Sequence, residues 1–299
     1  MDRVAAGEWI GLHAERSGAM ETVHERPWAT VLRVPIGDRV AWLKVCADVQ
    51  AFEPRLTGEL FARWPDRVGE VIAYDEHRRW LLLADAGTPV GVMGNPPEAW
   101  LVALPLYAEL QRGEVAYVAD HLAHGVPDLR LGTLATRYDE LLGLDLPLEP
   151  EEVRRLQQFA SRFAELCDEL GTCGVPDTIQ HDDLHHGNLY ARGSSVRVLD
   201  WGDACVGHPF VSLVVTFRFL EERTDLALSD PWFGRLRDAY LEPWGRNLSH
   251  SFTLALRVGA FARAIAYTRQ RASLSGDQRR LFDHDFSIVL RRAVRRVRD

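Results

Sequence analysis

The chain has 299 residues, 46% of them hydrophobic and 26% charged, which is enough for one large core or two modest ones. A formal net charge of −8 argues against a nucleic-acid-binding protein, because such proteins usually present a basic face. The sequence shows no CxxC pair, no apolar run of about 18 residues and no signal-peptide core at its N-terminus. We therefore expect a cytoplasmic protein that spans no membrane and acts as a monomer or a homodimer.

The first part of the chain is rich in strand signals. An extended stretch begins at Thr22–Val23, and β-branched residues are frequent in Ala29–Ile36. Gly37–Asp38 is a two-residue turn signal, so Arg39–Val45 is predicted to return as the second strand of a hairpin.

A helix is predicted over Ala51–Trp64, where apolar residues recur at helical spacing, and Pro65 ends it. Two further strands are expected around a polar turn, at Glu70–Asp75 and Trp80–Ala84. After Asp85–Pro89 the pattern becomes helical. The predicted helices are Pro97–Gln111, Gly132–Leu142, Glu151–Leu170, Pro209–Glu222, Pro231–Trp244, Phe252–Gln270 and Asp277–Arg298. This order predicts an α+β chain with a small β-rich lobe, residues 1–88, and a larger helical lobe, residues 89–299.

The segment from Gln180 to Asp203 combines oxygen-bearing side chains with a predicted hairpin. Leu189–Ala191 and Val196–Leu199 read as short strands around a Gly193–Ser194 turn. Asp183 and Asn188 precede this hairpin, and Asp200 follows it directly. Because a hairpin brings its two ends together, these oxygens are expected to converge on a site suited to Mg²⁺.

These residues resemble the catalytic and metal motifs of the aminoglycoside phosphotransferase and choline kinase family. The catalytic motif stands here as His181-Asp182-Asp183-Leu184-His185-His186-Gly187-Asn188, and the metal motif as Asp200-Trp201-Gly202. The resemblance implies a two-lobed protein-kinase-like fold and a kinase that transfers phosphate from ATP or GTP to a hydroxyl group of a small molecule.

The resemblance also implies roles for individual residues. Asp183 would be the catalytic base, and Asn188 and Asp200 would hold Mg²⁺. His181 and His185 would support the loop, with Gly202 and Asp203 supporting the metal motif. The structural role of His181 is favoured over a catalytic one.

Lys44 provides an independent sign of the same fold. It is the single lysine of the chain and lies at the end of the second hairpin strand, where a kinase-like fold places the lysine that binds the α- and β-phosphates. Its partner is predicted to be Glu53, with Glu59 as the alternative. The hinge that holds the nucleobase is expected at Ala84-Asp85-Ala86.

Two departures from the family pattern are visible. No glycine-rich loop precedes the hairpin, and the candidate covering loop is Glu25-Arg26-Pro27-Trp28. After the metal motif, Ser212 stands where many members carry an aspartate, and we expect it to cap a helix or to bind a backbone group.

The acceptor and two rival functions stay open. His186, Glu221, Glu222 and Asp225 are candidate acceptor-binding residues, which would suit an aminoglycoside or another cationic antibiotic. An amino-alcohol, sugar or nucleoside is equally permitted. The rival functions are a non-catalytic nucleotide-binding module and a metal-dependent hydrolase, whose zinc would be held by His181, Asp183, His185, His186 and His208.

Overall fold

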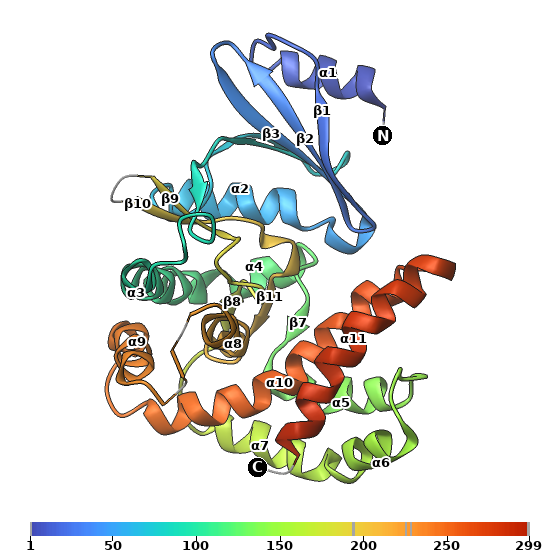
Figure 1. Ribbon diagram of the computed structural model, residues 1–299, viewed down its shortest axis with the longest axis vertical. Coiled ribbons are helices and arrows are strands. Elements are labelled where there is room, and N and C mark those ends of the chain that lie inside the picture. The colour runs from blue at the N-terminus through green and yellow to red at the C-terminus, as the bar shows by residue number, and fades with distance from the viewer. Residues whose placement is uncertain (1, 193–194, 225, 228, 298–299) are drawn as a thin grey trace. The chain divides into compact units, whose positions relative to one another are not determined.

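Figure 1 shows the computed structural model, which describes residues 2–192, 195–224, 226–227 and 229–297. The chain forms two compact units, each assembled from separate stretches of sequence. The first contains Met1–Ala99, Ala123–Val126 and His186–Asp203. The second contains Trp100–Leu122, Pro127–His185 and Ala204–Asp299.

A five-stranded antiparallel sheet forms the centre of the first unit. Its strands are, in sheet order, β1 (Glu21–Arg26), β2 (Ala29–Ile36), β3 (Arg39–Cys46), β5 (Trp80–Ala84) and β4 (Val71–Asp75). The predicted hairpin is confirmed, because β2 pairs with β3 through the two-residue turn at Gly37, whose φ of 54° suits glycine.

Two helices accompany this sheet. In α1 (Arg3–Gly11), Asp2 caps the N-terminus by accepting hydrogen bonds from the Val4 and Ala5 amides, and Trp9 packs against Trp80 with ring centroids 5.5 Å apart. The sequence prediction did not include α1. In α2 (Glu53–Arg63), which follows the 3₁₀ turn η1 (Asp48–Gln50), Leu56 and Leu60 are buried.

The remaining strands of the first unit form a small sheet. The hairpin β9 (Leu189–Arg192) and β10 (Ser195–Val198) is joined by β6 (Thr88–Pro89), and η3 (Trp201–Asp203) follows it. The predicted hairpin is therefore confirmed, although its Gly193–Ser194 turn lies outside the described residues.

The second unit is mainly helical. Its helices are α3 (Pro97–Glu114), α4 (Val118–Ala123), α5 (Leu131–Leu142), α6 (Pro150–Gln158), α7 (Ala160–Gly171), α8 (Leu213–Arg223), α9 (Pro231–Leu241), α10 (Ser249–Ala272) and α11 (Gly276–Arg296), with 3₁₀ turns η2 (Val115–Tyr117) and η4 (Glu242–Trp244). Aromatic rings join α5, α7 and α10, because Tyr138, Phe163 and Phe261 lie within 5.7 Å of one another by centroid. No described helix is both long and apolar enough to cross a bilayer.

A three-stranded sheet in the second unit supports the catalytic segment. It contains β7 (Asp128–Leu129), β11 (Cys205–Gly207) and β8 (Thr178–Gln180), in that order. His181 follows β8 directly, so the sheet fixes where the motif that begins at His181 leaves the core.

One predicted helix is divided. The apolar pattern from Glu151 to Leu170 predicts a single helix, but α6 ends at Gln158 and α7 begins at Ala160. Phe159 lies at the break, and its ring stacks on Phe261 at 5.0 Å. This contact joins residues far apart in the chain, so the local pattern could not reveal it.

Candidate active site

An ion-pair cluster of two buried residues and one exposed aspartate lies beside the central sheet. Lys44 is on β3, and its Nζ lies 2.7 Å from each carboxylate oxygen of Glu53 and 2.5 Å from Oδ1 of Asp200. Glu53 is in the first turn of α2, and Asp200 follows the β9–β10 hairpin. The structure thus brings together three of the residues that the sequence singled out, while Glu59 pairs with Arg55 at 2.8 Å instead.

Burial and charge act against each other in this cluster. Lys44 is 8% exposed and Glu53 is 1% exposed. Burial alone would lower the pKa of Lys44, but the charges of Asp200 and then Glu53 raise it above the usual range, so Lys44 remains an ammonium. Burial raises the pKa of Glu53, and Lys44 opposes that rise. Lys44 therefore favours the carboxylate form of Glu53.

The hairpin places Asn188 and Asp200 at its two ends. Asn188 precedes β9, and its carbonyl accepts a hydrogen bond from the Leu199 amide at 2.9 Å, just before Asp200. Asp200 has a φ of 65°, a left-handed conformation that is uncommon for residues other than glycine and clusters at functional sites. A carboxylate and an amide oxygen held in this way suit Mg²⁺, which binds few protein ligands and keeps waters or phosphate oxygens.

A cavity of about 470 Å³ opens next to these groups, within the size range of nucleotide and cofactor sites. Its polar end includes Lys44, Glu53, Asn188 and Asp200. Its apolar wall comes from the two neighbouring sheets and contains Val31, Trp42, Leu81, Leu83, Tyr190 and Leu199. This division suits a molecule with a flat apolar part and a charged part.

The predicted hinge contributes in part. Asp85 and Ala86 line the cavity, and the Asp85 carboxylate accepts a hydrogen bond from Trp42 Nε1 at 3.1 Å. The Ala84 amide donates to the Glu70 carbonyl at 2.9 Å, which extends the sheet, and Ala84 is not among the described lining residues. Val23 and His24 of β1 also line the cavity, at a β-bulge just before the predicted covering loop.

The metal motif is closely packed behind the cavity. Trp201 is fully buried, and a Cβ at Gly202 would overlap the side-chain amide of Gln50. A side chain at position 202 would therefore displace the amide of Gln50. Asp203 ends the η3 turn, where it completes the segment.

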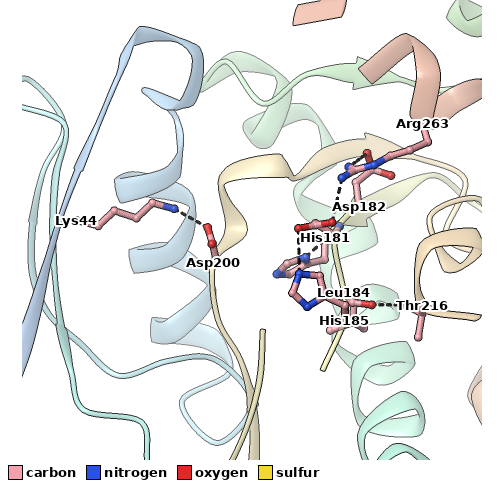
Figure 2. A network of polar contacts seen from close by, with 9 residues as sticks. Lys44, His181, Asp182, Leu184, His185, Asp200, Thr216 and Arg263 are labelled. Carbon is pink, nitrogen blue, oxygen red and sulfur yellow. Dashed lines mark hydrogen bonds and ion pairs between the residues drawn. The ribbon is translucent and has the colours of Figure 1, made fainter. Parts of the chain in front are cut away.

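In the second unit, polar side chains of the catalytic motif and of α10 contact Asp183. Figure 2 labels His185 and Arg263, which make these contacts. Oδ1 of Asp183 accepts a hydrogen bond from Arg263 at 3.0 Å, and Oδ2 lies 3.4 Å from Nε2 of His185. Burial alone would raise the pKa of Asp183, but Arg263 and then His185 lower it below the usual range. Asp183 is thus an ionised, oriented carboxylate.

The neighbouring histidines have distinct surroundings. His181 is fully buried, its amide donates to the Tyr107 hydroxyl at 2.9 Å, and its Nδ1 accepts from the Asp183 amide at 3.3 Å. These contacts suit a scaffold role. His186 belongs to the first unit, where its carbonyl accepts from the Gly91 amide and its ring lies against that glycine. Among the described residues, no group of three or more His, Cys, Asp or Glu side chains could hold a metal ion, which counts against the zinc alternative.

Ser212 binds differently from what the sequence predicts. It precedes α8 but makes no side-chain cap, and its amide donates to Oε1 of Gln180 at 2.8 Å. Its hydroxyl bonds with Tyr107, the residue that also holds the His181 amide. Ser212 therefore ties the segment after the metal motif to the start of the catalytic motif.

The candidate acceptor residues are mostly engaged or outside the described chain. Glu222 accepts a hydrogen bond from Arg292 at 3.1 Å and lies 3.7 Å from Arg218. Glu221 is exposed on the same helix, and Asp225 lies outside the described residues. Sequence reasoning missed Trp42 and Arg263, since neither belongs to a motif.

Family membership follows from sequence. The model of the phosphotransferase enzyme family (APH) matches residues 93–251, more than half of the chain. The chain belongs to this family. The resemblance seen in the sequence is thus confirmed, and the protein is a phosphotransferase. No curated protein sequence matches it.

Solved structures confirm the kinase-like fold of this phosphotransferase. An ethanolamine kinase of Plasmodium vivax is similar with a TM-score of 0.64 and 12% identity, over 92% of this chain and 81% of that chain. Choline kinase LicA from Streptococcus pneumoniae has a TM-score of 0.62 and 12% identity, over 96% and 98%. The GDP complex of aminoglycoside 2'-phosphotransferase-IIIa has a TM-score of 0.63 and 13% identity, over 99% of each chain.

Proposed function

We propose that the protein is a Mg²⁺-dependent kinase that transfers the γ-phosphoryl group of ATP or GTP to a hydroxyl group of a small molecule. The observation that carries this proposal is the ion-pair cluster of buried Lys44 and Glu53 with Asp200, at the polar end of a cavity that Asn188 also lines. Residues 1–88 would supply most of the nucleotide site, and residues 89–299 the catalytic aspartate and the acceptor site. Two of the similar solved structures are complexes, one with GDP and the other with AMP-PNP, which supports the proposal that this protein binds a nucleotide.

The residues of the cavity fit a nucleotide and its metal. The indole of Trp42, held by Asp85, offers a stacking surface for a base, and Asp85 and Ala86 offer the hinge backbone. Lys44 would bind phosphate oxygens, and Glu53 would keep its ammonium in place. Asn188 and Asp200 would hold Mg²⁺, which when bound offsets the negative charge of the phosphates.

Asp183 would orient the acceptor hydroxyl and take its proton. The new bond forms between the acceptor oxygen and the γ-phosphorus while the bond from that phosphorus to the β–γ bridging oxygen breaks. The nucleoside diphosphate leaves, and the proton moves from the carboxylate to solvent. An aspartate of low pKa suffices, because the transition state is loose and demands little proton transfer at its start.

The charges near Asp183 bear on the acceptor. Arg218 lies over the Phe219 ring at 4.1 Å, and that ring lies 4.8 Å from His185. Burial first and then Arg292 lower the pKa of Arg218, and Glu222 is shared with Arg292. We therefore propose an acceptor that is neutral or anionic near its reacting hydroxyl. In this it would differ from two of the similar solved structures, of which one is named as a choline kinase and the other as a complex with kanamycin.

The test is ATP and GTP consumption with a panel of hydroxy acids, sugar phosphates, sugars, amino-alcohols, nucleosides and aminoglycosides, with products identified by ³¹P NMR. Asp183→Ala should keep the binding of a fluorescent nucleotide but lower transfer by at least about a hundredfold. Transfer at the native rate by this variant would refute the assigned base. Nucleotide binding without turnover of any acceptor or water would favour the non-catalytic module, and preference for aminoglycosides would refute the charge argument.

We also propose that the protein is cytoplasmic. Its four cysteines are free thiols, which fits a reducing compartment.

A further inference from the structure

Helix α10 carries an arginine to the catalytic motif. Nη1 of Arg263 donates to Oδ2 of Asp182 at 2.9 Å, and Nη2 donates to Oδ1 of Asp183 at 3.0 Å. Figure 2 shows this side chain reaching from its helix to Asp182. Arg263 is 9% exposed, and its guanidinium lies 4.9 Å from the ring centroid of Tyr267, one turn further along α10. One planar group thus binds two consecutive carboxylates and is itself held by an aromatic ring.

Asp182 has an unusual backbone conformation. Its φ is 57°, in the left-handed region that glycine adopts easily and that costs other residues energy. Its side chain is also almost fully buried, at 5% exposure for the residue. A buried carboxylate at such a position needs a paired cation, and Arg263 is that cation. Because Asp182 directly precedes Asp183, fixing its backbone also fixes the direction in which the Asp183 side chain leaves the chain.

We propose that Arg263 is a positioning residue for phosphoryl transfer, which uses its two Nη groups to hold Asp182 and Asp183 in the geometry that the reaction requires. This inference rests on the proposed function of Asp183 as the base. It adds a role for a residue 80 positions after Asp183, on a helix that carries no recognised motif. It also gives a reason for an aspartate at position 182, where the backbone conformation would suit glycine.

The charges that face Asp183 can be named. Arg263 approaches from α10, His185 and His181 approach from the motif itself, and Asp182 is its neighbour. Burial raises the pKa of Asp183, and Arg263 is the first of the groups that lower it. Removing the guanidinium should therefore raise this pKa. A base with a raised pKa becomes protonated sooner as the pH falls, so the acid limb of the rate profile should move to higher pH.

The experiment compares Arg263→Met, which removes the charge, with Arg263→Lys, which keeps the charge but lacks the two Nη groups of the guanidinium. Arg257→Met is the matched control, since Arg257 is on the same helix and hydrogen-bonds to neither aspartate. Asp182→Asn tests the contribution of the ion pair between Arg263 and Asp182. Acceptor-free ATP hydrolysis, followed as release of inorganic phosphate, is the rate probe. A ¹³C NMR titration of the aspartate carboxyls, with Asp183→Asn for assignment, reports the pKa without any acceptor.

Arg263→Met should lower kcat about a hundredfold, because small misplacements of a catalytic group cost that much, while KM for ATP stays within about twofold. Its acid limb and its Asp183 titration should move up by at least about one pH unit. The kcat and the Asp183 pKa of Arg263→Lys should lie between those of Arg263→Met and those of the native protein. Both values should be native in Arg257→Met. If Arg263→Met does not fold, Arg263→Lys and Asp182→Asn carry the same test through the Asp183 titration.

Two results would overturn the inference. The first is an Asp183 titration that stays at its native pH in Arg263→Met. The second is a loss of rate that only follows the loss of folded protein in thermal unfolding. A native transfer rate in Asp183→Ala is a separate outcome, since it would remove the proposed base whatever Arg263 does.

Discussion

His208 gives a pH-dependence of stability whose size follows from the structure. It is buried, its Nδ1 accepts from the Phe210 amide at 3.3 Å, and its Nε2 lies 3.3 Å from Sγ of Cys173. Burial lowers the pKa of His208 from 6.5 to about 4. The folded protein therefore keeps this imidazole neutral, whereas the unfolded chain takes up a proton below pH 6.5. Stability from the neutral ring is fully present above pH 6.5 and declines as the pH falls towards 4.

The expected loss is about 2 kcal/mol between pH 7 and pH 5, and at most about 3 kcal/mol at lower pH, since each unit of pKa difference corresponds to about 1.4 kcal/mol. The assay is urea unfolding of the native protein and His208→Asn at both pH values. The asparagine oxygen replaces Nδ1 as acceptor for Phe210 but does not titrate. The native protein should lose about 2 kcal/mol more than the variant between the two pH values, and Cys173→Ser should behave like the native protein. Equal losses in His208→Asn and the native protein would refute the reasoning.

Three further predictions concern the site and its support. Glu53→Gln should lower kcat/KM for ATP by about ten- to a hundredfold, since Lys44 loses one of two charge-assisted partners, and Glu59→Gln on the same helix should not. Asp200→Asn should raise the Mg²⁺ concentration for half-maximal activity by at least about tenfold, as measured by metal titration; unchanged metal dependence would remove Asp200 from the proposed metal site. Gly259→Ala should lower the free energy of unfolding by about 1–3 kcal/mol, because a Cβ there would overlap the Val211 carbonyl, whereas Gly234→Ala meets open space and serves as the control in thermal unfolding.

Local patterns were enough for most elements and for the pairing of the first hairpin. Alternation and turn chemistry are local, and the strands of the central sheet agree with them. The break at Phe159 was not predictable, because the helical pattern continues through it and the contact with Phe261 comes from a distant helix. Helix α1 has a capping residue, Asp2, but its apolar face is short. The contact of Trp9 with Trp80, which the local sequence does not reveal, shows which face packs on the sheet.

The same distinction applies to the site. Asp183, Asn188 and Asp200 were found because their spacing belongs to a motif, and Lys44 because it is a single residue type at a predicted strand end. Arg263 was not found, since the chain has many arginines and helical periodicity does not reveal which of them turns towards a carboxylate. Trp42 was not found either, because its meaning depends on the cavity that two separate sheets line.

The single lysine makes this chain unusual as a substrate for amine chemistry. Apart from the N-terminal amine, Lys44 is the single amine that an acylating reagent can modify. Its side chain forms ion pairs with Glu53 and Asp200. An ammonium with a raised pKa is a poor nucleophile, so acylation waits until the ion pairs open and the proton leaves. The acylation rate of Lys44, measured by mass spectrometry on the intact protein, therefore reports how often the ion pairs open. A nucleotide bound in the cavity should lower this acylation rate, and the measurement needs no labelled ligand or engineered probe.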